Sequence, residues 1–300
     1  MTRKILSIAF YILVVAFLVS FATTLDLAAV FSFEINWLLI AAASLLAIAT
    51  RFIFAFIWRV LLSGMGAEID KKLSGELLAV YAKAWLGRYL PVSAGWVIGK
   101  IYFASNLGIS KTKLAVSSLM EAMQQLVIVM SLASLLLVFD PTIAELAGGY
   151  RVLLVIVSII GLLSITPKVF NSVVSLAHKL IRKTAIDSKQ LLNSATVLKT
   201  SGLFFITSVL NAGSLLLVAL AFDVDLLANS FLILGVSALA SALSILVVIA
   251  PAGLGVREGV LIIGLTLIVS PELALAITVM MRLMSIIWDL IFYLLARLRK

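Results

Sequence analysis

Two nine-residue stretches decide the fold: PVSAGWVIG, from Pro91 to Gly99, and PAGLGVREG, from Pro251 to Gly259. Both read Pro-x-x-x-Gly-x-x-x-Gly, and each residue of the second lies 160 positions after its counterpart in the first. Each stretch interrupts an apolar segment that is otherwise suited to a bilayer. A broken helix at membrane depth is tolerated only where it is buried in protein or lines a wet cavity. Matching breaks in two halves of a chain therefore predict a binding site near the membrane midplane.

The composition predicts an integral membrane protein. The chain has 300 residues, of which 63% are hydrophobic and 12% charged, whereas soluble domains average about 45–50% apolar and about 25% charged residues. The sequence has no cysteine and one histidine, His178, which excludes thiolate and histidine-rich metal centres. We therefore expect no metal and no cofactor.

The net charge of +9 is explained by the topology of a membrane protein. The basic residues gather in short loops and at the termini, which is the pattern of cytoplasmic loops in membrane proteins. We therefore expect no nucleic-acid partner. The same bias predicts a multi-pass membrane protein with both termini cytoplasmic. We expect its location to be the plasma membrane of a prokaryote.

The hydropathy pattern predicts an all-α polytopic membrane protein in one transmembrane domain, residues 1–300. About six spanning helices and two broken hairpins are expected. The spans are predicted over residues 5–25, 37–62, 114–139, 151–165, 201–222 and 272–298, and the hairpins over 76–104 and 226–269.

The loop charges predict how the hairpins sit in the membrane. Lys71 and Lys72 precede the first hairpin and Lys111 and Lys113 follow it, so both of its ends are expected inside. Its 29 residues are too few for two spans, which need about 40 residues, and a re-entrant hairpin is predicted. The second hairpin is expected to open outside. Residues 37–139 and 200–298 would then form an inverted repeat.

The segment between the repeats, residues 167–199, is predicted to be a cytoplasmic amphipathic linker. Apolar residues of 169–181 fall on one helical face, and basic residues tend to the other. This pattern is typical of a helix on the membrane surface that anionic lipid helps to hold.

The breaks predict an anion site. Half-helices that begin near Ser93 and Ala252 would present free N–H groups and the positive end of the helix dipole inside the protein. In a membrane the abundant anion is a lipid phosphate. The alternative is that the glycines only permit tight helix packing. The candidate substrate-binding residues, from both breaks and from charges at depth, are Arg88, Pro91, Ser93, Gly95, Lys100, Glu121, Gln125, Pro251, Gly253, Gly255, Arg257, Glu258, Arg282 and Asp289.

Several of these charges have alternative interpretations. By the repeat offset Arg282 corresponds to position 122, so Glu121 and Arg282 are expected to line one cavity. Lys100 can instead extend its ammonium group to the membrane interface. Arg257 and Glu258 can form a local pair, and Arg51 can be the structural partner of an acid that the sequence leaves open.

The motifs resemble those of a known family. LPVSAGWVIGK (90–100), APAGLGVREG (250–259) and Met281-Arg282-Leu283 are similar to the membrane domain of lysylphosphatidylglycerol synthases and its stand-alone, flippase-like relatives, over roughly residues 5–296. The matching residues are Pro91, Gly95, Pro251, Gly253, Gly255, Arg257, Glu258 and Arg282. Family members often carry Glu-Arg after the first hairpin, where this chain has Glu121-Ala122. The aminoacyl-transferase domain of the synthases is absent, so no synthase activity is expected.

The resemblance implies a lipid flippase or transporter rather than an enzyme. An anionic headgroup, of a phospholipid or a polyprenyl phosphate, would bind near the half-helix N-termini, and the acyl chains would stay in the lipid. The sequence has no P-loop, and Glu121, Glu258 and Asp289 are candidate proton carriers. The alternatives are an accessory subunit of a lipid- or glycan-modifying enzyme, a membrane enzyme acting on headgroups, and a channel.

Overall fold

The computed structural model describes residues 33–89, 95–146, 149–182, 191–247 and 255–299. The predicted helix over residues 5–25 lies outside this part of the chain, as do the tips of both breaks. Within the described residues the chain is helical, with no strand. The helices are α3 (Trp37–Gly64), α4 (Lys71–Leu86), the 3-10 turn η1 (Gly87–Tyr89), α5 (Gly95–Ala104), α6 (Lys111–Phe139), α7 (Pro141–Leu146), α8 (Tyr150–Ser164), α9 (Pro167–Arg182), α10 (Ser194–Ala221), α11 (Leu226–Leu246), α12 (Val256–Leu265) and α13 (Pro271–Leu298).

Five helices are long and apolar enough to cross a membrane: α3, α6, α10, residues Ala228–Leu246 of α11, and α13. Four of them were predicted as spans. The predicted span over 151–165 corresponds to α8, which has 15 residues against the roughly 20 that a crossing needs. It counts as a sixth span only together with α9, from which it is bent by 91°. The fifth span, α11, is the long arm of the predicted second hairpin.

Side-chain caps set the starts of α10 and α6, and both starts lie before the predicted ones. Helix α10 begins at Ser194 rather than at residue 201, because the Asn193 side chain accepts a hydrogen bond from Thr196 N at 2.8 Å. The predicted linker over 167–199 therefore ends in residues that belong to α10. Helix α6 begins at Lys111 rather than at residue 114, because Ser110 caps its N-terminus.

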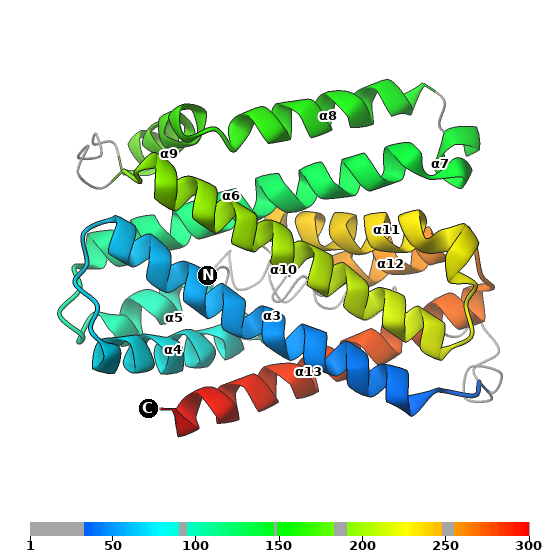
Figure 1. Cartoon of the computed structure of the whole chain (residues 1–300), viewed down its shortest axis with the longest axis horizontal. Helices are drawn as coiled ribbons and strands as arrows, with labels where there is room; N and C mark the ends of the chain where they lie inside the picture. The colour runs from blue at the N-terminus through cyan, green and yellow to red at the C-terminus, as the bar shows by residue number, and fades with distance from the viewer. Residues whose placement is uncertain (1–32, 90–94, 147–148, 183–190, 248–254, 300) are drawn as a thin grey trace, which may run out of the picture.

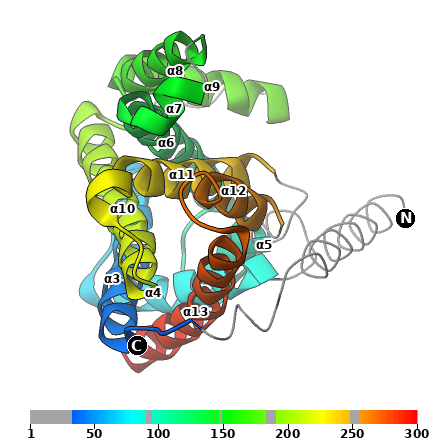
Figure 2. The same cartoon turned by 90° about the vertical axis from the view of Figure 1, so that its right-hand side faces the viewer.

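The helices form one packed assembly in which α8 and α9 lie at the edge. Both views place α8 and α9 on one side of the molecule and α13 on the opposite side, with α6 and α11 between them (Figures 1 and 2). Helix α3 packs along α10, and α6 packs against α11 and α8. Most of α8 faces outward, since Ser158 is its buried residue.

The two hairpins lie at opposite ends of the bundle. Lys113 Nζ, on α6, donates to the carbonyl of Gly66, just after α3, at 2.8 Å, so α4 and α5 leave and return at one end. At the other end Asn36 N, before α3, donates to the carbonyl of Ala221 in α10 at 3.0 Å. The end with α9 and the C-terminus of α13 is on the left in Figure 1, and α7 is on the right.

Three helix pairs of the predicted repeat are similar in length, whereas α4 has 16 residues and α11 has 21. Helices α3 and α10 each have 28 residues, α5 and α12 each have 10, and α6 and α13 have 29 and 28. The inverted symmetry and the re-entrant position of the hairpins in a bilayer stay predictions.

Helix α9 has the amphipathic character that the sequence predicts. Phe170 and Val174 are buried against the bundle, whereas Val169 and Val173 stay exposed on the adjoining stripe. Its contact with a membrane surface stays a prediction.

Candidate functional site

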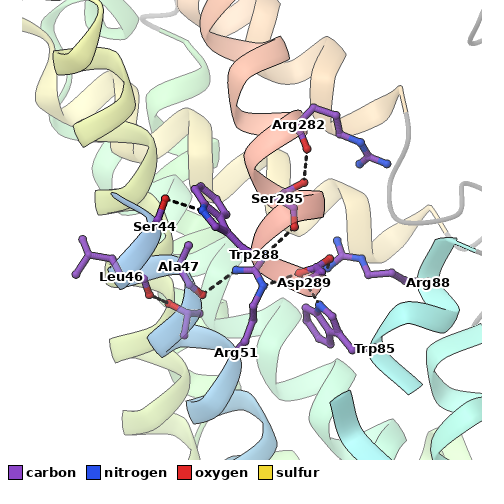
Figure 3. A network of polar contacts seen from close by, with 11 residues as sticks. Ser44, Leu46, Ala47, Arg51, Trp85, Arg88, Arg282, Ser285, Trp288 and Asp289 are labelled. Atoms are coloured by element: carbon purple, nitrogen blue, oxygen red, sulfur yellow. Dashed lines mark hydrogen bonds and ion pairs between the residues drawn. The ribbon is translucent and has the colours of Figure 1, made fainter. Parts of the chain in front are cut away.

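Asp289 of α13 anchors the largest group of buried charges. Its carboxylate is 0% exposed and accepts hydrogen bonds from Arg51 Nε at 2.5 Å and from Trp85 Nε1 at 3.0 Å. Arg88 NH1 lies 3.7 Å from the second carboxylate oxygen (Figure 3). Helices α3, α4 and α13 and the turn η1 therefore converge on one acid.

The Arg51 guanidinium group makes several contacts besides the one with Asp289. Its NH1 donates to the carbonyl of Ala47 at 2.7 Å, and its NH2 donates to the carbonyl of Ser285 at 3.4 Å. Its guanidinium carbon lies 5.5 Å from the ring centre of Trp288, the residue that precedes Asp289 in the sequence (Figure 3). Asp289 is thus the acid partner of Arg51 that the sequence left open. A buried pair of this kind fixes α3 against α13.

The second half-helix begins at Val256 rather than near Ala252, which corrects the prediction. Gly255 has a φ of 84°, a value that L-residues with a side chain rarely adopt, so the helix starts directly after it. The Glu258 carboxylate accepts from Gly255 N at 2.8 Å and lies 3.3 Å from Arg282 NH1. Glu258 therefore closes the helix start and joins α12 to α13.

Arg257 brings these charges into one group. It interacts electrostatically with Arg88, Glu258, Arg51 and Arg282, which come from four different elements. We call these residues together with Asp289 the arginine cluster. Counted over the described residues alone, the cluster holds four arginines and two carboxylates, which is a formal charge of +2.

A separate buried pair lies between α5 and α6. Lys100 Nζ lies 2.5 Å from Glu121 Oε2, and the Tyr81 hydroxyl donates to Glu121 Oε1 at 2.7 Å. The ammonium nitrogen is 4.2, 5.3 and 5.2 Å from the ring centres of Trp96, Trp58 and Tyr81. Lys100 is 1% exposed, so the alternative in which it extends to the membrane interface is wrong.

Glu121 and Arg282, which were predicted to line one cavity, each take part in an ion pair with another residue. Glu121 pairs with Lys100, and Arg282 pairs with Glu258. The two residues thus belong to different ion pairs, and the cavity that they were predicted to line stays a prediction. Because the repeat offset aligns positions along the chain, it could not predict which side chains turn toward each other.

Helix α4 links the two groups, which the sequence analysis did not predict. The rings of Tyr81 and Trp85 stack with centres 5.8 Å apart. Tyr81 donates to Glu121, while Trp85 donates to Asp289. Arg88 also lies over Trp85, with 4.8 Å between its guanidinium carbon and the ring centre. The signal available in the sequence was two aromatic residues four positions apart on one face of α4.

The remaining predicted residues are placed as follows. Gln125 is half-buried, while its neighbour Gln124 is buried and donates to Ser201 Oγ on α10 at 2.6 Å. A Cβ at Gly95 would collide with the Gly87 carbonyl oxygen, so the arms of the first hairpin touch there. Pro91, Ser93, Pro251 and Gly253 lie outside the described residues. Among the described residues no group of three or more metal-ligating side chains occurs.

Gly255 and Gly259, the two described glycines of the second motif, have different backbone requirements, which predicts opposite effects of substitution. Gly255→Ala is expected to lower the free energy of unfolding by about 1–3 kcal/mol, because its φ of 84° strains a residue with a Cβ. Gly259→Ala is the matched control, since nothing lies within 4 Å of a Cβ built there. It is expected to be neutral or stabilising by up to about 1 kcal/mol. Thermal unfolding in detergent micelles measures both, and equal effects would contradict the assignment.

This fold defines a class of protein. It is a helical, multi-pass membrane protein with buried charge groups between short and long helices. The chain belongs to the family described as the lysylphosphatidylglycerol synthase TM region, which matches residues 4–292. This match confirms the resemblance that the motifs carry and places the chain among membrane proteins with a lipid-related function. A search of curated proteins finds no match.

Proposed function

We propose that the protein moves a lipid with an anionic headgroup between the two leaflets of the membrane, and that the headgroup binds at the arginine cluster. The observation that carries this proposal is the excess of two positive charges where α3, η1, α12 and α13 meet. Charge at membrane depth is costly and tends to be paired. An anionic headgroup would lower the net positive charge of the cluster.

The chemistry of the cluster favours a phosphate. A guanidinium group presents several N–H donors in a planar fork that matches phosphate oxygens. Arg257 lies in the first turn of α12, where the helix dipole adds positive potential. A lipid phosphate fits both the family's association with lipids and the membrane setting. The acyl chains would stay in the surrounding bilayer.

The side chains contribute more to this site than the bare helix end does. Glu258 already accepts from Gly255 N, so one free N–H of α12 is satisfied within the protein. The roles predicted for Pro91, Ser93, Pro251 and Gly253 belong to segments outside the described residues and stay part of the proposal. Gly95 acts by letting the arms of the first hairpin approach each other.

The proposal includes an orientation and a setting. The end of the bundle that carries α9 would face the cytoplasm of a prokaryotic cell, because its loops hold the basic residues. The headgroup would move through the bundle from the hairpin at one end to the hairpin at the opposite end. A lipid- or glycan-modifying enzyme would be the natural partner, since it supplies or consumes such a lipid.

The test is leaflet exchange in reconstituted vesicles. Phosphatidylcholine vesicles would carry either a trace of acyl-labelled phosphatidylglycerol or an equal amount of acyl-labelled phosphatidylcholine, and dithionite would quench the outer label. The protein is expected to accelerate exchange of the anionic lipid by about tenfold or more over the choline lipid. A third arm would carry a labelled polyprenyl phosphate. If none of the anionic probes exchanges, with or without a proton gradient, the flippase proposal fails and an accessory-subunit role takes its place.

A further inference from the structure

The arginine cluster carries more positive than negative groups within the described residues, four guanidinium groups against two carboxylates. We propose that the headgroup it takes is a phosphomonoester, with about two negative charges, rather than a phosphodiester, with about one. Phosphatidic acid and a polyprenyl phosphate belong to this class, and phosphatidylglycerol does not. The inference rests on the proposed function and narrows its substrate to a chemical class.

Two of the arginines are neutralised inside the protein. Arg51 Nε lies 2.5 Å from Asp289 Oδ1, and the two side chains are 8% and 0% exposed. Arg282 NH1 lies 3.3 Å from Glu258 Oε1 and joins α13 to α12. Each pair is neutral as a unit, so a ligand need not bring any charge to it.

The other two arginines give the cluster its positive charge. Arg88 NH1 lies 3.7 Å from Asp289 Oδ2, so this one carboxylate serves both Arg51 and Arg88 (Figure 3). Arg257 makes no hydrogen bond and no ion pair within the part of the chain that the structure describes. The formal charge of +2 therefore corresponds to Arg88 and Arg257.

These two arginines come from the two hairpins. Arg88 lies in η1, just before the first break, and Arg257 lies in the first turn of α12, just after the second. The intervening residues of the breaks, 90–94 and 248–254, include no charged residue. Arg88 and Arg257 repel each other as like charges. An anion that contacts both would replace this repulsion with attraction.

A phosphomonoester suits two guanidinium groups better than a phosphodiester does. It has three terminal oxygens and a charge of about −1.5 to −2 at neutral pH. It can accept a bidentate pair of hydrogen bonds from one guanidinium and still offer an oxygen to the other. A phosphodiester has two such oxygens and about one charge, which leaves one positive charge of the cluster uncompensated. Uncompensated charge at membrane depth is costly, so the cluster favours the monoester.

The position of the cluster favours a lipid over a soluble phosphate. Arg51 and Asp289 lie well inside α3 and α13, which have 28 residues each and are apolar enough to cross a membrane. Leu283 and Ile287, on α13 near Arg282, are 53% and 44% exposed. Acyl chains cover such a surface in a bilayer, so a lipid beside α13 holds its headgroup close to the cluster.

The experiment compares two lipids that differ by one charge. Phosphatidylcholine vesicles that contain the protein would carry a trace of acyl-labelled phosphatidic acid or of its methyl ester with the same chains. Exchange would be followed at about pH 8, where the monoester is fully charged, by quenching the outer label with dithionite. After subtraction of the rate in protein-free vesicles, we expect the monoester to exchange about tenfold or more faster than the methyl ester.

Single-charge variants test whether the arginines set this preference. Arg88→Gln and Arg257→Gln each remove one positive charge, and each is expected to lower the ratio of the two exchange rates by about threefold or more. Arg88→Gln leaves Asp289 paired with Arg51. Arg88→Lys keeps the charge and is expected to keep most of the ratio. Arg59→Gln, outside the cluster, is expected to leave it unchanged. Because both rates come from one protein preparation, the folded fraction cancels in the ratio.

A second measurement separates a lipid from a soluble phosphomonoester and does not depend on transport. Protein in phosphatidylcholine nanodiscs is expected to unfold at a higher temperature with phosphatidic acid than with its methyl ester, because a ligand of the folded state stabilises it. Glycerol 3-phosphate at the same concentration is expected to have no such effect. Equal stabilisation by glycerol 3-phosphate would overturn the choice of a lipid.

The two measurements distinguish failure of this inference from failure of the proposed function. Equal exchange of the two lipids refutes the monoester preference and leaves the flippase standing. Selective stabilisation by phosphatidic acid without exchange of either lipid refutes the flippase and leaves the preference standing. Absence of both effects refutes both. A preference that survives in Arg88→Gln and Arg257→Gln overturns its assignment to these two arginines.

Discussion

Replacing Asp289 by alanine is expected to lower the free energy of unfolding by about 3–5 kcal/mol. The substitution removes the carboxylate that Arg51 contacts at 2.5 Å and Arg88 at 3.7 Å, and it deprives the Trp85 indole of its acceptor. Removing one partner of a buried ion pair is costly because the remaining charge stays where water does not reach it. Thermal or denaturant unfolding in detergent micelles measures the loss.

Two further variants interpret that result. Asp289→Asn keeps an oxygen acceptor for Arg51 and is expected to lose less than the alanine variant. Glu272→Ala removes a carboxylate from the first turn of the same helix, α13, where it is partly exposed. It is expected to change the free energy of unfolding by at most about 1 kcal/mol. If Asp289→Ala and Glu272→Ala unfold alike, Asp289 does not hold the bundle together.

Replacing Arg257 by alanine is expected to slow exchange of the anionic lipid by about 10–100-fold, since a hydrogen bond to a charged group contributes about 1.5–3 kcal/mol. Arg257 lies in the first turn of α12 and interacts with the other three arginines of the cluster. Because it repels those arginines, its removal is not expected to unfold the protein. Arg257→Lys keeps the charge but loses the planar guanidinium group. Its rate of lipid exchange is expected to lie between those of the wild type and of Arg257→Ala.

Arg59 provides the matched control for Arg257. Both side chains are half-buried arginines in helices, but Arg59 donates to Ser74 Oγ at 2.7 Å and lies outside the cluster. Arg59→Ala is expected to leave exchange within about twofold of the wild type. The headgroup site would have to be placed elsewhere if folded Arg257→Ala protein exchanged lipid at the wild-type rate. The site would also have to be placed elsewhere if Arg59→Ala slowed lipid exchange as much as Arg257→Ala does.

The sequence predicted that charges at depth would be paired, but not with which residue. Arg51 was expected to have an acidic partner, and that partner, Asp289, lies 238 positions away. No local spacing contains this information, because α3 and α13 become neighbours only when the bundle packs. The same limit explains why the sequence did not predict that Glu121 pairs with Lys100 and Arg282 with Glu258.

Local backbone chemistry explains the other differences. The proline of the second motif was taken as the start of a half-helix, whereas the positive φ of Gly255 and the carboxylate of Glu258 delay the start to Val256. The Glu258 residue was visible three positions after Gly255, as a capping pattern requires. Asn193 likewise moved the start of α10 ahead of the apolar segment that the hydropathy marks.

The sequence by itself determined that the chain is an all-helical membrane protein of this family. Hydropathy and loop charge are sums over local residues, and the motifs around Pro91 and Pro251 are local too. Only the tertiary structure decided that the charges form two groups, one around Asp289 and one around Glu121, joined through α4. Which buried charges meet depends on how helices distant in sequence rotate and pack to leave the fewest ions unpaired, and that choice is made by the whole bundle at once.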